Sequence, residues 1–353
     1  MRKIIFYMAV VALLSNCNIH NGNVLQIAEQ GSFTVGGTVL TDSLGRSYHG
    51  DHAYVFYQKP VNAQKYPLVF AHGVGQFSKT WETTPDGREG FQNIFLRRGF
   101  STYLVDQPRR GNAGRSTEAV TISPAFDEEE WFNRFRVGIY PNYFEGVQFS
   151  RDKEALNQYF RQMTPNIGSV DFEVYSDAYA ALFDKIGPAI FVTHSQGGPV
   201  GWHTLLKTDN IKAIVSYEPG GGIPFPEGQV PEEGKILTLS KKTEGVEVPM
   251  SDFMKYTEIP IIVYYGDNLP ETDERPELYE WTRRLHLMRK WAKMLNDLGG
   301  DVTVIHLPEI GLHGNTHFPF SDLNNIEVAD LLSKWLYKKN LGGCVRISKM
   351  QGT

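Results

Sequence analysis

Pro188-Ala-Ile-Phe-Val-Thr-His-Ser195-Gln-Gly-Gly-Pro-Val-Gly-Trp202 is the stretch of sequence that decides the fold. A run of β-branched and aromatic residues ends at Thr193, a turn of small residues follows, and the remainder can form a helix. Ser195 is therefore expected at the corner between a buried strand and a helix. A turn this tight holds the serine backbone in an uncommon conformation and lifts the hydroxyl above the sheet. The stretch predicts an exposed nucleophile at one edge of a sheet.

Apolar runs and amphipathic stretches alternate along the rest of the chain. Stretches 32–41 and 53–58, separated by a turn-rich segment at 42–51, are expected to form an antiparallel pair of strands. Strands that alternate with helices predict the α/β class, with a mostly parallel sheet that is covered on both faces. The further expected strands lie at 67–73, 101–106, 211–217, 259–265 and 302–307. The expected helices lie at 90–98, 170–186, 276–298 and 326–338.

The length of 353 residues, without an internal repeat or an interdomain linker, predicts one domain over 32–353. Two segments interrupt the alternation of strands and helices. The first, 112–168, is rich in aromatic residues, and we expect it to be an inserted helical cap over the site; it is called the cap segment below. Ordinary structural helices are the alternative for it. The second, 220–256, is expected to be a loop-rich excursion.

The N-terminus carries the features of an export signal. Two basic residues precede an apolar run at 4–14 that is too short to span a bilayer comfortably. The pattern predicts a signal peptide over 1–17. Its end resembles a bacterial lipoprotein processing site, at which Cys17 would be lipidated, although the residue before the cysteine is larger than usual. Ordinary secretion is the alternative. Residues 18–31 are then expected to be a polar tether, and the protein is expected to be exported.

Composition narrows the classes of partner. The net charge of −5 is mild and no basic tract occurs, so nucleic acid is not an expected partner. His49 and His52 have no third ligand nearby, so no metal site is predicted. No cofactor is expected. The sequence leaves the oligomeric state open, with a homodimer as one option.

The corner around Ser195 resembles the nucleophile elbow of the α/β-hydrolases. The usual pattern is G-x-S-x-G, and here Thr193 replaces the first glycine in T-H-S-Q-G. The added side chain must be accommodated against the next element. A strand-to-helix turn with a structural serine is the alternative interpretation.

A serine nucleophile needs a base within hydrogen-bond reach, and the base needs a carboxylate that orients it. In the α/β-hydrolases the chain order is Ser, acid, His. Only His313 and His317 follow the last expected strand, and their spacing favours His317. Glu218 and Asp267 each follow an expected strand. Both strand ends face the same edge of the sheet, so the residues alone leave the choice of acid open.

Two backbone N–H groups are needed to stabilise the negative oxygen that forms during acyl transfer. Gln196, at the start of the helix after the elbow, is expected to supply the first. Val74, which follows His72-Gly73 at the end of a buried strand, is expected to supply the second. Trp81 is expected either in the core or as a wall of the acyl pocket beside Val74.

Several segments resemble a small group of secreted bacterial esterases with the α/β-hydrolase fold. They are Thr80–Arg88, Phe95–Gln107, the elbow His194–Gly198, Tyr217–Gly220 and Gly314–His317 with Asp322 after it. In that group the acid is a glutamate after the strand that follows the elbow. The resemblance therefore implies Glu218 rather than Asp267 and His317 rather than His313, and it supports Val74 and Gln196 as the oxyanion donors.

These features together predict a cofactor-free serine carboxylic-ester hydrolase. Ser195, His317 and Glu218 would form its triad, and a small-molecule ester would be its substrate. A serine peptidase or amidase on the same scaffold is one alternative, and a non-catalytic surface-binding protein that kept the fold is another. The sequence predicts neither the physiological ester nor its acyl length.

Overall fold

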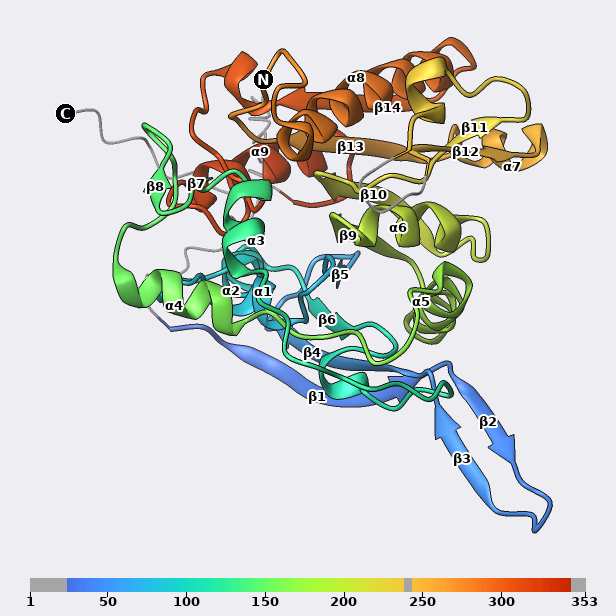
Figure 1. Cartoon of the computed structure of the whole chain (residues 1–353). Coiled ribbons are helices and arrows are strands. Elements are labelled where there is room, and N and C mark those ends of the chain that lie inside the picture. Colours follow the sequence, from blue (N-terminus) through green and yellow to red (C-terminus); the bar gives the residue numbers. More distant parts are fainter. Residues whose placement is uncertain (1–23, 238–242, 344–353) are drawn as a thin grey trace, which may run out of the picture.

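The computed structural model describes residues 24–237 and 243–343, and its centre is an eight-stranded sheet (Figure 1). The strand order is β1-β4-β6-β5-β9-β10-β13-β14. The pairings β1–β4 and β4–β6 are antiparallel, and the remaining five are parallel, which confirms the predicted α/β class. The strands are β1 (Ile27–Val35), β4 (Ala53–Pro60), β5 (Leu68–Ala71), β6 (Thr102–Asp106), β9 (Ala189–His194), β10 (Ile211–Tyr217), β13 (Pro260–Tyr265) and β14 (Asp301–His306).

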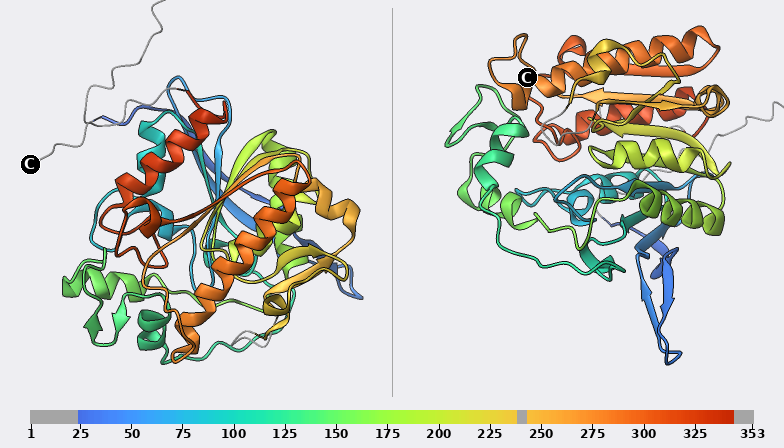
Figure 2. Two further views of the ribbon diagram at one scale, coloured as in Figure 1. Left: turned by 90° about the horizontal axis from the view of Figure 1, so that it is seen from above. Right: turned by 45° about the vertical axis from the view of Figure 1, so that its right-hand side comes forward.

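Helices cover both faces of the sheet, as the left view of Figure 2 shows. Helices α5 (Phe172–Ile186) and α6 (Gly197–Leu205) and most of α8 (Pro276–Asp297) pack on one face, and α2 (Phe91–Arg97) and α9 (Asn325–Lys338) pack on the other. Every residue of β5, β6 and β9 is therefore buried. A strand buried on both faces reads as a continuous apolar run, which is why these strands were visible in the sequence.

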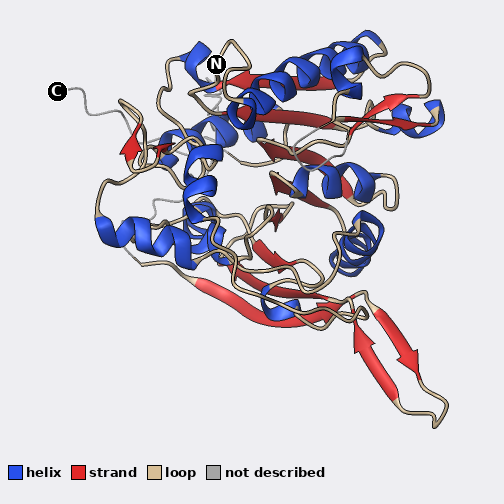
Figure 3. Cartoon of the chain, viewed as in Figure 1, coloured by secondary structure: helices blue, strands red, loops and turns tan. Residues whose placement is uncertain are grey.

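The first predicted strand, 32–41, differs from the structure. Strand β1 begins at Ile27, inside the stretch predicted as a polar tether, and ends at Val35. Gly36 and Gly37 then take positive φ angles of 68° and 93° and break the strand. The chain continues into a hairpin of β2 (Thr38–Thr41) and β3 (Ser47–Gly50), which projects from the body of the molecule (Figure 3). The segment predicted only as a turn therefore includes a strand.

The cap segment contains two helices and a short hairpin that was not predicted. The helices are α3 (Glu128–Arg134) and α4 (Lys153–Arg161), the hairpin is β7 (Gly138–Ile139) with β8 (Asn142–Tyr143), and the one-turn helix η1 (Gly111–Ala113) lies at its start. The segment 220–256 is more regular than expected. It forms β11 (Ile223–Pro226), η2 (Glu232–Lys235), β12 (Gly245–Val248) and α7 (Met250–Lys255), with β11 parallel to β12. Two further short helices are α1 (Lys79–Glu82) and η3 (Leu307–Ile310).

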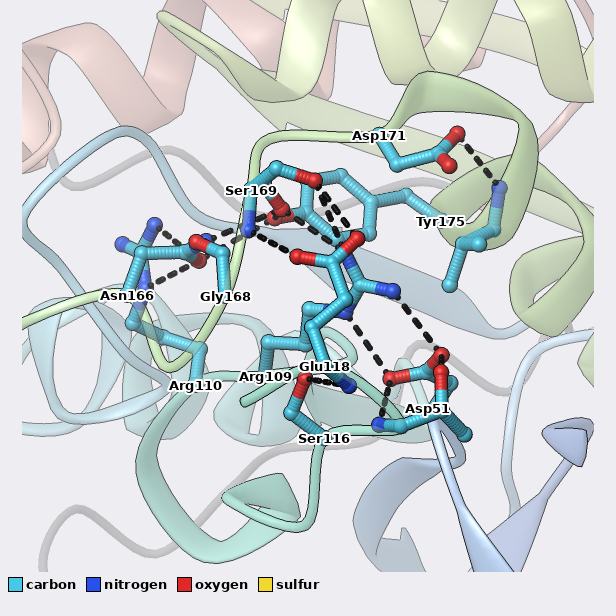
Figure 4. Close-up of polar contacts among 12 residues, drawn as sticks. Asp51, Arg109, Arg110, Ser116, Glu118, Asn166, Gly168, Ser169, Asp171 and Tyr175 are labelled. Atoms are coloured by element: carbon cyan, nitrogen blue, oxygen red, sulfur yellow. Dashed lines mark hydrogen bonds and ion pairs between the residues drawn. The ribbon is translucent and has the colours of Figure 1, made fainter. Parts of the chain in front are cut away.

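A buried arginine ties the two ends of the cap segment together (Figure 4). Nε and Nη2 of Arg109 donate to the two carboxylate oxygens of Asp51, at 2.8 and 2.9 Å. Its Nη1 donates to Glu118 and to the carbonyl of Ser169, both at 3.0 Å. Glu118 in turn accepts the Ser169 N–H at 2.7 Å. The start and the end of the insertion are thus fixed to the turn before β4.

Candidate active site

Ser195 occupies the predicted corner between β9 and α6. Its φ is 52°, in the left-handed region that a residue with a side chain rarely adopts. The Ser195 N–H donates to the carbonyl of Tyr217 at 3.0 Å, and the Ser195 carbonyl accepts from the N–H groups of Gly198 and Gly220, both at 2.8 Å. Three backbone hydrogen bonds therefore hold the strained residue, as is common for residues that take part in catalysis.

Thr193, the departure from the usual elbow pattern, is accommodated by a glycine on the following helix. A Cβ at Gly201 would lie 3.0 Å from Cγ2 of Thr193, so a larger residue there would crowd the threonine. The Thr193 hydroxyl donates to Oγ of Ser216 at 2.8 Å. The side chain is fully buried and its polar atom is bonded, so the substitution leaves the elbow intact.

The turn after β5 lies directly against the serine. A Cβ at Gly73 would lie only 2.8 Å from Cβ of Ser195, so glycine is required there for the close approach. Nη1 of Arg110, a fully buried side chain, donates to the Gly73 carbonyl at 3.3 Å and fixes the turn. The N–H groups of Val74 and Gln196 donate to no group in the part of the chain that the structure describes. Both proposed oxyanion donors are thus without an internal acceptor.

His317 is fully buried, and its ring contacts the predicted acid. Nδ1 of His317 lies 2.6 Å from Oε2 of Glu218. A carboxylate accepts, so Nδ1 carries the proton and Nε2 presents its lone pair. Nε2 has no hydrogen-bond partner among residues 24–237 and 243–343. Burial holds the pKa of the His317 imidazole well below its ordinary value, and the positive charges of nearby arginines, Arg136 first, lower it further.

Glu218 has a positive φ of 45°, directly after β10, and its side chain is fully buried. Oε1 accepts the Gly266 N–H at 2.5 Å and is also paired with Nη2 of Arg136, a cap-segment residue. Oε2 remains for His317. The predicted acid and the predicted base are thus in contact, and the acid has a buried cationic partner that sequence reasoning missed.

Asp267, the competing acid, has a different role in the structure. Oδ2 of Asp267 accepts the Gly314 N–H at 2.7 Å, and its own N–H donates to the Asn315 carbonyl at 2.8 Å. Nδ1 of His313 is 3.6 Å from Oδ2 of Asp267, and the histidine side chain is 70% exposed. Asp267 therefore holds the loop that carries His317, and His313 lies at the surface.

Asp322, quoted above for the resemblance, supports the same loop. Its carboxylate accepts the N–H and the hydroxyl of Thr316, both at 2.7 Å, and the side-chain amide of Asn315 at 3.0 Å. Burial raises the pKa of Asp322 to about 7, against the effect of these hydrogen bonds. The residue just before His317 is thereby fixed on both its backbone and its side chain.

Trp81 packs in the hydrophobic core. Its side chain is fully buried, and its ring stacks on Phe320 with the centroids 4.0 Å apart. It also packs on Phe70 and Phe91. Trp81 lies within α1, and these contacts favour the core interpretation of its side chain.

Two further findings concern membrane-spanning helices and the predicted N-terminal signal. No helix within 24–237 and 243–343 has the length and apolar character needed to cross a membrane. The predicted signal peptide and Cys17 lie outside the described residues.

Comparison with known proteins adds independent evidence. A family model described as the alpha/beta hydrolase family matches residues 68–331. A probable secreted lipase, phiG, from a fungus (Fungal sp., strain ATCC 74256) is 28% identical over 84% of this chain and 88% of its own length. The solved structure of a novel bacterial esterase superposes with a TM-score of 0.72 and 31% identity, over 91% of this chain and 98% of that one. The architecture, the elbow and these matches agree, and the chain belongs to the alpha/beta hydrolase family.

Proposed function

We propose that this chain is a serine hydrolase of small carboxylic esters, with Ser195 as nucleophile, His317 as base and Glu218 as the acid that orients the base. The observation that carries the proposal is the 2.6 Å contact between Nδ1 of His317 and Oε2 of Glu218. Family membership supports it, because the chain order of the family is nucleophile, acid, histidine. The similarity to an esterase and to a probable lipase favours an ester over an amide substrate.

In the proposed reaction, Oγ of Ser195 attacks the ester carbonyl carbon while Nε2 of His317 takes the hydroxyl proton. The carbonyl electron pair moves onto oxygen, where the N–H groups of Val74 and Gln196 stabilise the negative charge. When the tetrahedral intermediate collapses, the alcohol leaves with the proton from His317, and the acyl group stays on Ser195. Water then attacks the acyl carbon as His317 takes one of its protons. When this second tetrahedral intermediate collapses, the bond between the acyl carbon and Oγ of Ser195 breaks, His317 returns the proton to Oγ, and the carboxylic acid is released.

The electrostatics of the base suit this role. A general base must be neutral before it accepts a proton. Burial and the neighbouring arginines lower the pKa of His317, so the ring is neutral at pH 7. The Glu218 carboxylate then stabilises the imidazolium that forms as the proton moves.

We also propose that the cap segment covers the site and that the protein is exported. Phe135 and Arg136 of that segment touch His317 and Glu218, which supports the first statement. The N-terminal pattern and the similarity to a protein described as a probable secreted lipase support the second. A lipid anchor at Cys17 is tested by detergent partition: the full-length chain should enter the detergent phase and the Cys17→Ala variant should not. Equal partition of both would refute the anchor.

Ser195→Ala tests the proposed function. We expect ester turnover to fall by several orders of magnitude, as in serine hydrolases that lose the nucleophile. A fluorophosphonate probe should label the wild type at Ser195 and leave the variant unlabelled, while circular dichroism is unchanged. A panel of matched esters and amides measures the preference for esters. Wild-type turnover in the variant would end the serine mechanism, and a probe that fails to label the folded wild type would favour a binding protein.

A further inference from the structure

Three consecutive residues at the end of α3, Arg134, Phe135 and Arg136, contact residues around the proposed base and acid. The carbonyl of Arg134 accepts Nε1–H of Trp281 at 3.0 Å. The carbonyl of Phe135 accepts the backbone N–H of His317 at 3.0 Å. The Phe135 ring stacks on the His317 imidazole, with centroids 4.6 Å apart and planes inclined by 18°. Trp281 approaches the same imidazole, with the centroids 4.1 Å apart. The cap segment therefore supports the base directly.

Arg136, the next residue, supports the acid. Its φ is 62°, and this left-handed backbone conformation ends the turn after α3. Its side chain is fully buried. Nη2 is paired with Oε1 of Glu218, Nε donates to the carbonyl of Asp267 at 2.7 Å, and the guanidinium carbon lies 5.5 Å from the ring centroid of Trp281. A buried guanidinium held by a carboxylate, a carbonyl and an aromatic ring has one defined position.

The pattern of contacts on Glu218 separates its two oxygens. Arg136 and the Gly266 N–H both bind Oε1, and His317 is the only described residue that binds Oε2. A fully buried carboxylate needs a compensating charge, and Arg136 supplies it without competing for the oxygen that faces the base. Rotation of the carboxylate would break both contacts on Oε1. The arginine thus fixes the direction in which Oε2 points.

We propose that Arg136 is a positioning residue for the reaction, which holds Glu218 with Oε2 turned to His317 and so makes the cap segment a working part of the catalytic apparatus. The inference rests on the proposed function, because it assigns Glu218 and His317 their roles. Arg136 contacts neither a reacting atom nor the base, and it acts through the carboxylate. The cap segment cannot leave the site as a unit while the acid keeps this partner.

The positive charge of Arg136 has a second, opposing effect. It lies near His317 and disfavours the imidazolium, which contributes to the lowered pKa of that ring. The base is also surrounded by other charged or titratable groups from every side: Arg134 from α3, Arg284 from α8, His194 from β9 and Glu218 after β10. Loss of Arg136 should therefore raise the pKa of His317 while it loosens the acid. A purely structural residue would change neither property.

The test is the rate at which a fluorophosphonate inactivates each variant as a function of pH, together with kcat and KM for an ester. Arg136→Met should lower kcat about 10- to 100-fold, the loss typical when a residue that orients a functional side chain is removed. KM should stay unchanged. The acid limb of the inactivation profile should move to higher pH. Arg136→Lys keeps the charge, so its acid limb should stay near that of the wild type while kcat recovers only in part.

Arg109→Met is the matched control. Arg109 is also buried, also has a positive φ (67°), and also pairs with a carboxylate, but it contacts none of the proposed catalytic residues. The Arg109→Met variant should have a lower free energy of unfolding than the wild type, while its folded form keeps the wild-type kcat and pH profile. Wild-type kcat in Arg136→Met, or an acid limb that does not move, overturns the inference. If that variant does not fold, wild-type kcat in Arg136→Lys overturns it instead. If the fluorophosphonate does not inactivate the wild type, the proposed function is refuted. This outcome is distinct from the results for the two Arg136 variants.

Discussion

Two buried arginines hold the cap segment against the rest of the fold, and they differ in which oxygens of their carboxylate partners they leave free. Arg109 and Arg136 both have positive φ angles and both pair with a buried carboxylate. Arg109 occupies both oxygens of Asp51, at 2.8 and 2.9 Å. Arg136 occupies only one oxygen of Glu218, and the other faces His317. An arginine that binds both carboxylate oxygens serves as an anchor. An arginine that binds only one oxygen leaves the other free to bind a base.

The two carboxylates, Asp51 and Glu218, also differ in the residues that surround them. Asp51 also accepts the N–H and the hydroxyl of Thr117, so all its contacts lie within the anchor at the base of the insertion. Both acids have a positive φ, 56° for Asp51 and 45° for Glu218, a conformation that aspartate adopts more readily than glutamate. They differ in place: Glu218 lies at the end of β10, next to the elbow strand, with one carboxylate oxygen facing His317. We infer that the Arg109–Asp51 pair contributes to stability and that the Arg136–Glu218 pair contributes to activity.

The largest expected effect comes from exchanging each carboxylate for its amide. Glu218→Gln should lower kcat roughly 10⁴-fold, by analogy with the loss of the orienting acid in a serine-protease triad. Asp51→Asn should leave kcat of the folded protein near that of the wild type. Glu218→Gln leaves the buried Arg136 without its carboxylate partner and should lower the free energy of unfolding by about 3–5 kcal/mol. Asp51→Asn should lower it by less, because Arg109 keeps its ion pair with Glu118. Activity is therefore measured on protein shown to be folded by circular dichroism.

The double variant Arg136→Met/Glu218→Gln separates activity from stability. Removal of Arg136 should restore part of the free energy of unfolding that Glu218→Gln loses, because the cation left without its carboxylate partner is no longer buried there. Turnover should stay as low as in Glu218→Gln alone, since residues that act as a unit are not additive. If the double variant regains turnover, Glu218 is not the acid. If Asp51→Asn loses turnover while folded, the division between the two pairs is wrong.

Much of this arrangement could be predicted from the sequence, because it is encoded in short contiguous stretches of the chain. Ser195 stands in a strand–turn–helix pattern, and the two histidines after the last strand fall in one glycine-rich loop. The choice of Glu218 over Asp267 came only from the resemblance to known esterases, since both follow strands at the same sheet edge. The structure separates them by contact: one carboxylate reaches His317, and the other binds the backbone of the loop.

Arg136 could not be found in the same way. Its position depends on how the end of α3 docks on α8 and on the loop after β13, a tertiary contact that leaves no periodic signal. Its left-handed backbone is unusual for arginine, so no turn rule indicates it. The β2–β3 hairpin was missed because β2 was joined to the preceding strand and β3 was taken as a turn, and their residues are nearly all exposed, so no burial pattern separates them. Sequence patterns thus located the sheet and the strand–turn–helix corner at Ser195, and long-range packing fixed the rest.

A smaller effect concerns the acid stability of the anchor. Burial would raise the pKa of Asp51, but hydrogen bonds from Arg109 and Thr117 hold it at about 2, below its ordinary 3.8. A carboxylate with a depressed pKa adds stability above its unfolded-state pKa and loses it as the pH falls through the folded-state value. The free-energy gap between wild type and Asp51→Asn should therefore be full above about pH 4 and should close toward pH 2. Urea unfolding across that range measures it, and a gap independent of pH would contradict the ion-pair account.

The smallest effect is expected at Asp267, which lies outside both arginine pairs. Arg136 binds only its backbone carbonyl, which survives any change of side chain. The side chain accepts the Gly314 N–H, and an asparagine can still accept through its amide oxygen. Asp267→Asn should therefore cost about 1 kcal/mol of unfolding free energy, the typical net value of one hydrogen bond, and less than tenfold in kcat. Thermal melting and ester kinetics measure the two. A loss of activity as large as that of Glu218→Gln would mean that Asp267 is the acid of the reaction, and Arg136 would then be holding a structural glutamate.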